Sequence, residues 1–177
     1  MRRAGRGLTR RDFALSSAFA GAAAVIGCRA KGDGDFLRDR DAHILAVLCD
    51  QIIPADDFAS ASQAGVVTYI DRQLARHYRR HQKIYRNGLE QAEQMSRIRF
   101  RCALTDASAS QQHEVAVALE KENRTFFDLL RQHTMEGYYG SPRHGGNRNA
   151  VSWRMLGLAE PPLRGRAQYD LRKGSQS

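Results

Sequence analysis

Cysteine is scarce in this chain, which has only three among its 177 residues, at positions 28, 49 and 102. They form no C-x-x-C pair and no C-x-x-C-H sequence, so the chain encodes neither a cysteine-based zinc module nor an attachment site for c-type haem. Three cysteines are also too few for a small disulfide-built scaffold. With 42% hydrophobic and 27% charged residues, the chain has the composition of one globular domain with its own core.

A hydrophobic run long enough to span a membrane is also lacking. The uncharged, alanine-rich stretch Ala14–Gly27 would cover roughly 21 Å as a helix, which is short of the ~30 Å hydrocarbon core of a bilayer. It follows a basic segment and leads to small residues, which is the order of a secretory leader. We therefore expect residues 1–30 to be a signal peptide.

The leader contains Thr9, Arg10, Arg11, Asp12 and Phe13 in sequence. This segment resembles the twin-arginine export signal, Ser/Thr-Arg-Arg-x-Phe-Leu, although alanine follows the phenylalanine here. It predicts export of the folded protein by the twin-arginine translocase, to the periplasm or the periplasmic face of the membrane. The alternative is an ordinary export signal with a basic start.

The end of the leader allows two outcomes. The residues before Cys28 form a loose lipobox with Gly27 in the expected place, so Cys28 would become a lipidated N-terminus that tethers the protein to a membrane surface. Alternatively, the leader is cleaved near Ala24 or Ala30 without lipidation.

The formal net charge is +9, which invites a nucleic-acid-binding hypothesis. However, the first 28 residues hold five arginines against one aspartate, and the segment after Pro162 holds four basic residues against one acidic residue. The middle of the chain is close to neutral, and export would separate it from nucleic acid. We therefore expect no nucleic-acid partner.

Helical periodicity predicts a mostly α-helical protein with a single small domain. We expect a linker over residues 31–43, a helical domain over 44–161 with a long glycine-rich loop near its C-terminal end, and a disordered basic tail over 162–177. Within the domain, one helix should end before Pro54, and a second should run from about Ala64 to Phe100 with a break near Gly88.

Two further helices are expected from their capping signals. Residues 105–110 offer several N-cap candidates, and Thr125 with Asp128 resembles a capping box. A glycine-rich loop should follow over residues 137–149, and then a short apolar piece over 151–158.

Candidate catalytic or metal-binding residues are few. His77 and His81 have the spacing of two metal ligands on one helical face, but neighbouring arginines favour a solvated basic surface. His133 and Glu136 lie one helical turn apart and form either an acid/base pair or a brace at the helix end. We assign no catalytic, cofactor-binding or metal-binding residue.

The segment from Glu136 to Trp153 combines aromatic residues, arginines and glycine turns, as partner-binding surfaces do. The same composition also fits a loop folded over its own core with Trp153 buried. The candidate interface residues are Glu136, Tyr138, Tyr139, Pro142, Arg143, Gly145, Gly146, Asn147, Arg148 and Trp153.

Several segments, in order, resemble one protein family. They are residues 48–54, 64–71, 126–131, 134–139 and 141–148, together with Trp153 and Gly157. Over roughly residues 44–161 the chain is similar to the small subunit of membrane-associated gluconate 2-dehydrogenase, called subunit 3 or the gamma subunit.

This resemblance implies a role in an enzyme complex. The large subunit would be a flavoprotein of the glucose–methanol–choline type that carries FAD and oxidises a sugar, sugar acid or alcohol, and a multihaem cytochrome c would accept the electrons. The small subunit would hold no cofactor, would aid maturation of the flavoprotein, and would bring it across the membrane through its own leader. The alternative is a free-standing envelope hydrolase or metalloenzyme that uses His133, Glu136 and His144.

Overall fold

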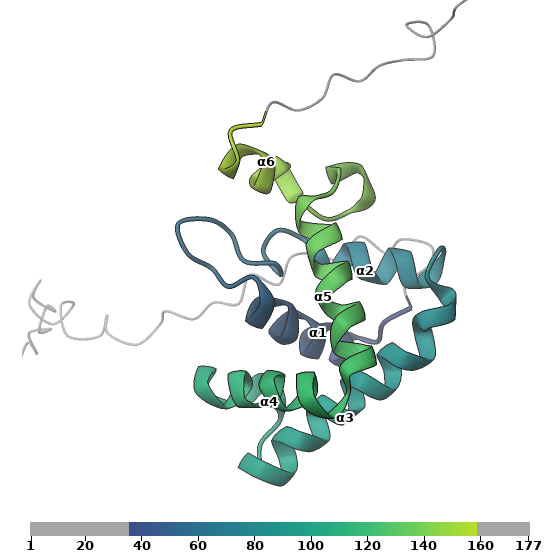
Figure 1. Cartoon of the computed structure of the whole chain (residues 1–177), viewed down its shortest axis with the longest axis vertical. Helices are drawn as coiled ribbons and strands as arrows, with labels where there is room; N and C mark the ends of the chain where they lie inside the picture. Colours follow the sequence, from purple (N-terminus) through teal and green to yellow (C-terminus); the bar gives the residue numbers. More distant parts are fainter. Residues whose placement is uncertain (1–35, 159–177) are drawn as a thin grey trace, which may run out of the picture. The chain divides into compact units, whose positions relative to one another are not determined.

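A computed structural model describes residues 36–158 of the chain (Figure 1). Contacts divide the chain into Met1–Gly32 and Asp33–Ser177, and all described residues belong to the second unit. Within them the structure has six α-helices and no strand, so the prediction of a small helical domain is confirmed. The helices are α1 (Asp39–Ile52), α2 (Val66–Ala75), α3 (Gln82–Phe100), α4 (Ala109–Glu122), α5 (Arg124–Tyr139) and α6 (Val151–Met155). Four short 3-10 turns lie between them: η1 (Arg79–His81), η2 (Leu104–Asp106), η3 (Pro142–His144) and η4 (Arg148–Ala150).

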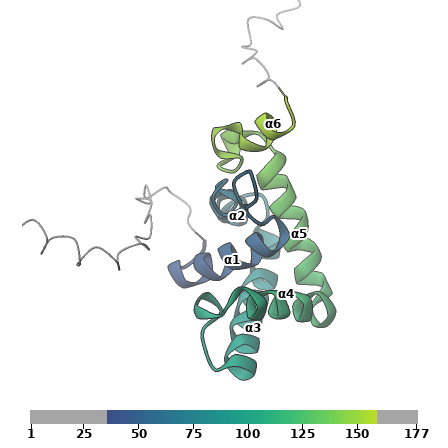
Figure 2. The ribbon, with the colours of Figure 1, turned by 90° about the vertical axis from the view of Figure 1, so that its left-hand side faces the viewer.

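Helix α1 is the centre of the core. It packs against α2, α3, α4 and α5, and in both Figure 1 and Figure 2 it lies among them. Its buried residues Ile44, Leu45, Leu48 and Cys49 recur at the three- and four-residue spacing of one helical face. The helix begins at Asp39, so part of the predicted 31–43 linker is helical.

The break in the predicted long helix lies before η1, and the expectation of a break at Gly88 is wrong. Helix α2 ends at Ala75, where Arg76 leaves the helical region with φ −124° and ψ −87°. Gly88 is instead buried inside α3, because the ring of Phe126 from α5 packs directly on its Cα.

Of the two predicted helix caps, the one before α4 is confirmed and the one before α5 is wrong. Ser108 is the N-cap of α4, and it forms a capping box with Gln111 as the 105–110 candidates suggested. Thr125 does not cap α5. That cap is Asn123, whose side chain accepts a hydrogen bond from the Phe126 amide at 3.2 Å.

Helix α5 runs two residues beyond Gly137, so the glycine-rich loop starts later than predicted and covers residues 140–150.

Among the described residues, no helix combines the length and apolar character that crossing a bilayer requires.

Candidate functional site

The loop between α5 and α6 folds back onto the rest of the domain. The amide of Arg148 donates a hydrogen bond to the Ala64 carbonyl at 2.8 Å, just before α2. Gly145 adopts φ +102°, which favours glycine. Gly146 is buried, and a Cβ there would collide with the backbone carbonyl of Gly137. The glycines therefore allow close packing of the loop against α5.

Three of the predicted interface residues are buried in this packing. The Asn147 amide nitrogen donates to the Gly140 carbonyl at 2.9 Å, and its oxygen accepts from the Ser152 amide at 3.0 Å. The Tyr138 hydroxyl donates to the Ala59 carbonyl at 2.7 Å. Since the side chains of Tyr138 and Asn147 and the Gly146 backbone are inaccessible, their assignment to a partner surface is corrected to a structural role.

The remaining members of the predicted set are accessible to different degrees. Tyr139, Arg143 and Arg148 are exposed, whereas Glu136, Pro142, Gly145 and Trp153 are half-buried. Trp153 is not a core residue. Its indole Nε1 donates to the Tyr139 carbonyl at 2.9 Å, which holds α6 against the end of α5.

Three exposed apolar residues, Met135, Leu156 and Leu158, lie near the predicted residues Tyr139 and Trp153 in the chain and are absent from the predicted set. Met135 and Tyr139 lie one turn apart on α5, and Leu156 and Leu158 follow Trp153 directly after α6. We call these five residues the α5–α6 patch. They include four of the six large hydrophobic residues that are exposed in the described part of the chain. The four-residue spacing of Met135 and Tyr139 was the available sequence signal.

A cluster of hydrogen-bonded aromatic residues lies on the other side of α5. The His133 ring is buried and stacks on Tyr78 at 4.4 Å between centroids, and its Nδ1 is hydrogen-bonded to the Tyr85 hydroxyl at 2.9 Å. Burial is the main reason that the pKa of His133 lies below its ordinary value; Glu136 opposes this shift, and His81 and Arg80 add to it.

Glu136 accepts hydrogen bonds from Tyr78 at 2.9 Å, Tyr69 at 3.1 Å and Gln132 at 2.8 Å. Partial burial alone would raise the pKa of Glu136, but these three hydrogen bonds together hold it below the ordinary value. The cluster therefore ties the α2–α3 connection to α5, as expected of a brace.

This geometry gives little support to an acid/base site of His133, Glu136 and His144. His144 is exposed in η3, and none of the interactions among described residues joins it to His133 or Glu136. His133 is buried and stacked between the rings of Tyr78 and Tyr85.

His77 and His81 do not share a helical face, because the chain leaves α2 before His77 and His81 ends η1. No group of three or more His, Cys, Asp or Glu side chains in residues 36–158 has an arrangement suited to a metal ion.

The two described cysteines are free thiols. Cys49 is fully buried and accepts a hydrogen bond from the Thr134 hydroxyl at 3.3 Å. Burial raises the pKa of Cys49 to about 12, so the thiol is protonated and unreactive at neutral pH.

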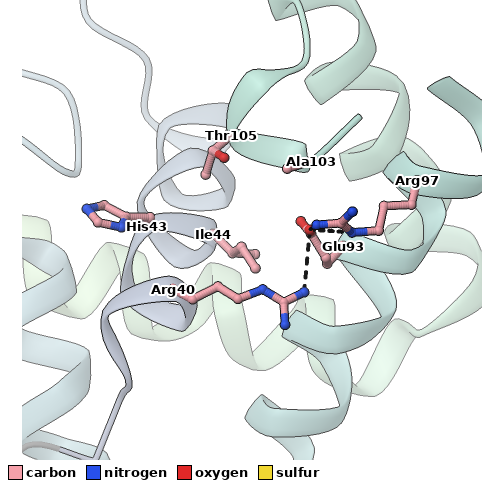
Figure 3. A pocket seen from close by; sticks show the side chains of 7 residues that line it. All are labelled: Arg40, His43, Ile44, Glu93, Arg97, Ala103 and Thr105. Carbon is pink, nitrogen blue, oxygen red and sulfur yellow. Dashed lines mark hydrogen bonds and ion pairs between the residues drawn. The ribbon is translucent and has the colours of Figure 1, made fainter. Parts of the chain in front are cut away.

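A cavity of about 410 Å³ lies between α1, α3 and η2. Figure 3 shows Arg40 and Arg97 converging on the buried carboxylate of Glu93, while His43 points away. Glu93 accepts hydrogen bonds from Arg97 at 2.8 Å and the Leu104 amide at 3.0 Å, and Arg40 lies 3.4 Å away. The Glu93 carboxylate is thus paired with two arginines and a backbone amide, and we interpret these contacts as a structural ion cluster that lines the cavity.

The predicted export residues Arg10, Arg11 and Phe13 and the predicted lipidation site Cys28 lie outside the described residues.

Comparison with known proteins supports the resemblance seen in the sequence. The family described as gluconate 2-dehydrogenase subunit 3 matches residues 39–159, which is most of the chain and nearly all of the helical domain. No curated protein and no solved structure matches the chain. The chain therefore belongs to the gluconate 2-dehydrogenase subunit 3 family, whose members are small subunits of multi-subunit dehydrogenases.

Proposed function

We propose that this protein is the non-catalytic small subunit of an exported FAD-dependent dehydrogenase of the glucose–methanol–choline type. It binds the large flavoprotein, aids its maturation, and carries it through the twin-arginine translocase to the periplasmic side of the membrane. FAD belongs to the large subunit, and haem c belongs to a cytochrome subunit that takes the electrons onward. Family membership and the predicted leader support this proposal.

The α5–α6 patch is the observation that carries the partner-binding role. Monomeric proteins rarely expose contiguous apolar surface of this kind, and Trp, Tyr and Arg are the residues that contribute most to protein interfaces. Here the Trp153 indole is hydrogen-bonded to the Tyr139 carbonyl, Met135 lies one turn from Tyr139 on α5, and Leu156 and Leu158 follow Trp153 in the chain. Arg143 is exposed in the adjoining loop. Hydrogen bonds of Tyr138, Asn147 and Trp153 tie this end of α5 to the α1–α2 connection, to the loop and to α6.

The experiment is co-purification of the tagged protein from envelope extract, followed by mass spectrometry and an absorption spectrum. We expect a large flavoprotein with a flavin spectrum to accompany the wild-type chain. Replacing Tyr139 and Leu156 by serine should weaken the complex at least about tenfold. The matched control is Ile98→Ser, which removes another exposed hydrophobic residue, 81% exposed, on α3.

Two results would contradict the proposal. One is a wild-type chain that purifies without any flavoprotein; the other is a Tyr139/Leu156 variant that retains its partner as well as the Ile98 variant does. If the isolated chain instead showed hydrolase activity or bound a metal, the enzyme alternative would replace the subunit role.

The export role has its own test. Replacing Arg10 and Arg11 by lysine should hold both the small subunit and the flavoprotein in the cytoplasm, as measured by cell fractionation. Normal export of the flavoprotein in that strain would overturn the carrier role.

A further inference from the structure

The connection between α2 and α3 carries a concentrated positive charge. Arg76, Arg79, Arg80 and Lys83 lie within eight consecutive residues, with His77 and His81 between them. We call these six residues the basic turn. No aspartate or glutamate occurs in the sequence between Arg72 and Leu89.

The four cations of the basic turn are exposed and, within the described part of the chain, form no ion pair. Several other surface arginines of the domain do have acidic partners. Arg99 pairs with Glu122 at 3.1 Å, and both Arg124 and Arg131 pair with Asp128 at 3.2 Å. The positive charge of the basic turn is therefore not neutralised locally.

The basic turn is also held in place. The Arg79 guanidinium donates to the Ala75 carbonyl at 2.8 Å, and Arg80 donates to the His81 ring at 3.0 Å. Tyr78 anchors the turn to Glu136 on α5. Both carboxylate oxygens of Glu136 accept hydrogen bonds from Tyr69, Tyr78 and Gln132. Glu136 therefore forms no ion pair with the arginines of the basic turn.

The basic turn lacks the exposed apolar anchors of a protein interface. None of the exposed large hydrophobic residues of the described chain lies in the basic turn. In protein interfaces arginine occurs beside apolar and aromatic anchors, whereas a cationic surface without such anchors suits a dense array of phosphates. Membrane lipids and nucleic acids both provide such an array, and the choice of lipid rests on the export in the proposed function.

We propose that the basic turn binds the phosphate headgroups of anionic phospholipids, so that the subunit rests with this turn against the membrane surface. The α5–α6 patch, which is built from other residues, then stays available for the dehydrogenase. The contact is electrostatic and requires no particular lipid stereochemistry.

The test uses the full-length chain and co-sedimentation with two kinds of vesicle, phosphatidylcholine alone and phosphatidylcholine with one-third phosphatidylglycerol. Binding should depend on phosphatidylglycerol and should weaken at high salt. Each cation near an anionic surface contributes roughly fivefold to binding. Replacing Arg76, Arg79, Arg80 and Lys83 by glutamine should therefore reduce the partition coefficient at least about tenfold.

Two further variants separate this charge effect from other causes. The control variant, with glutamine at Arg99, Arg101, Arg124 and Arg131, removes the same charge from other exposed positions and should bind like the wild type. The charge-conserving variant, with lysine at Arg76, Arg79 and Arg80, should also bind, because lipid attraction needs charge and not the guanidinium geometry. All variants keep the leader, and circular dichroism confirms their folding.

The proposal is overturned if the glutamine variant of the basic turn binds phosphatidylglycerol like the wild type, or if the lysine variant loses as much binding as the glutamine variant. It is also overturned if that glutamine variant loses the flavoprotein while its vesicle binding is unchanged, because the turn would then be a protein interface. A DNA duplex that binds the wild type more tightly than the vesicles do would assign the turn to nucleic acid. The vesicle and DNA results do not depend on whether the flavoprotein co-purifies with the wild-type chain, so they remain informative if the proposed subunit role fails.

Discussion

Asn147 belongs to a residue type common in recognition loops, but here its side chain holds the loop together by hydrogen bonds. Its side chain is fully buried, and it joins the Gly140 carbonyl before η3 to the Ser152 amide at the start of α6. It also adopts φ +43°, a left-handed conformation that asparagine tolerates better than most residues. The amide thus fixes the shape of the loop beneath the α5–α6 patch.

Asn147→Ala should lower the free energy of unfolding by about 2 kcal/mol, because the buried Ser152 amide and the half-buried Gly140 carbonyl lose their partner. Chemical denaturation of the purified chain measures this. Arg143→Ala, an exposed change in the same loop, should have an effect within about 0.5 kcal/mol. Equal effects for the two variants would show that the Asn147 bridge contributes nothing.

His133 makes the stability of the domain depend on pH. Because its pKa is lowered by folding, the unfolded chain binds the proton more readily, and the stabilising contribution is complete above the ordinary histidine pKa of about 6.5. This contribution is lost as the pH falls below that value. His81, whose pKa is lowered by burial and by Arg80, acts in the same direction.

We expect denaturation midpoints to fall between about pH 7 and pH 5 in the wild type. His133→Gln should be less stable at pH 7 but should show a flatter pH dependence. The exposed His113→Gln on α4 should keep the wild-type slope. A His133 variant with an unchanged slope would exclude this residue as the source.

At the scale of elements, the contact between α3 and α5 depends on a glycine inside a helix. Gly88 is buried, and the Phe126 ring occupies the space that a side chain would need. Glycine inside a helix is normally about 1 kcal/mol less favourable than alanine, and here that cost is offset by the close packing of two helices.

Gly88→Ala should therefore destabilise the protein by about 2 kcal/mol, although helix propensity alone predicts stabilisation. Asn87→Ala changes the neighbouring exposed position of α3. No packing opposes the higher helix propensity of alanine there, so the free energy of unfolding should rise by a few tenths of a kcal/mol. Thermal or chemical denaturation measures both variants. A stabilised Gly88→Ala variant would mean that Phe126 moves aside without loss.

At the scale of the molecule, the two proposed binding surfaces differ in chemistry. The α5–α6 patch is apolar and aromatic, whereas the basic turn is cationic and carries no exposed large hydrophobic residue. Inside the domain, Glu93, Glu136 and Cys49 are hydrogen-bonded to Leu104, Tyr78 and Thr134 respectively. Two separate surfaces of different chemistry are consistent with the proposed role of the chain as a binding subunit.

The isolated chain should accordingly show no visible absorption from flavin or haem and no dehydrogenase activity. Both should appear only when the large subunit is co-expressed. An absorption spectrum and a dye-reduction assay on the chain alone, with the co-purified complex as the positive control, check this expectation. Flavin that stays with the isolated chain through gel filtration would contradict it.

The helical class, the family and the Ser108 cap could all be predicted from the sequence, because apolar periodicity, ordered family segments and side-chain capping are local patterns. The break between α2 and α3 could not be placed, since an isolated glycine is a weak helix breaker once a partner ring packs on it, as Phe126 does on Gly88.

Only the tertiary structure separated the two interpretations of the loop from Gly137 to Asn149. By composition, Tyr138, Tyr139 and Asn147 are equally good candidates for a partner surface. In the structure, Tyr138 and Asn147 are buried and bonded to Ala59, Gly140 and Ser152, whereas Tyr139 is exposed. Burial depends on residues distant in sequence, and a local pattern does not contain that information.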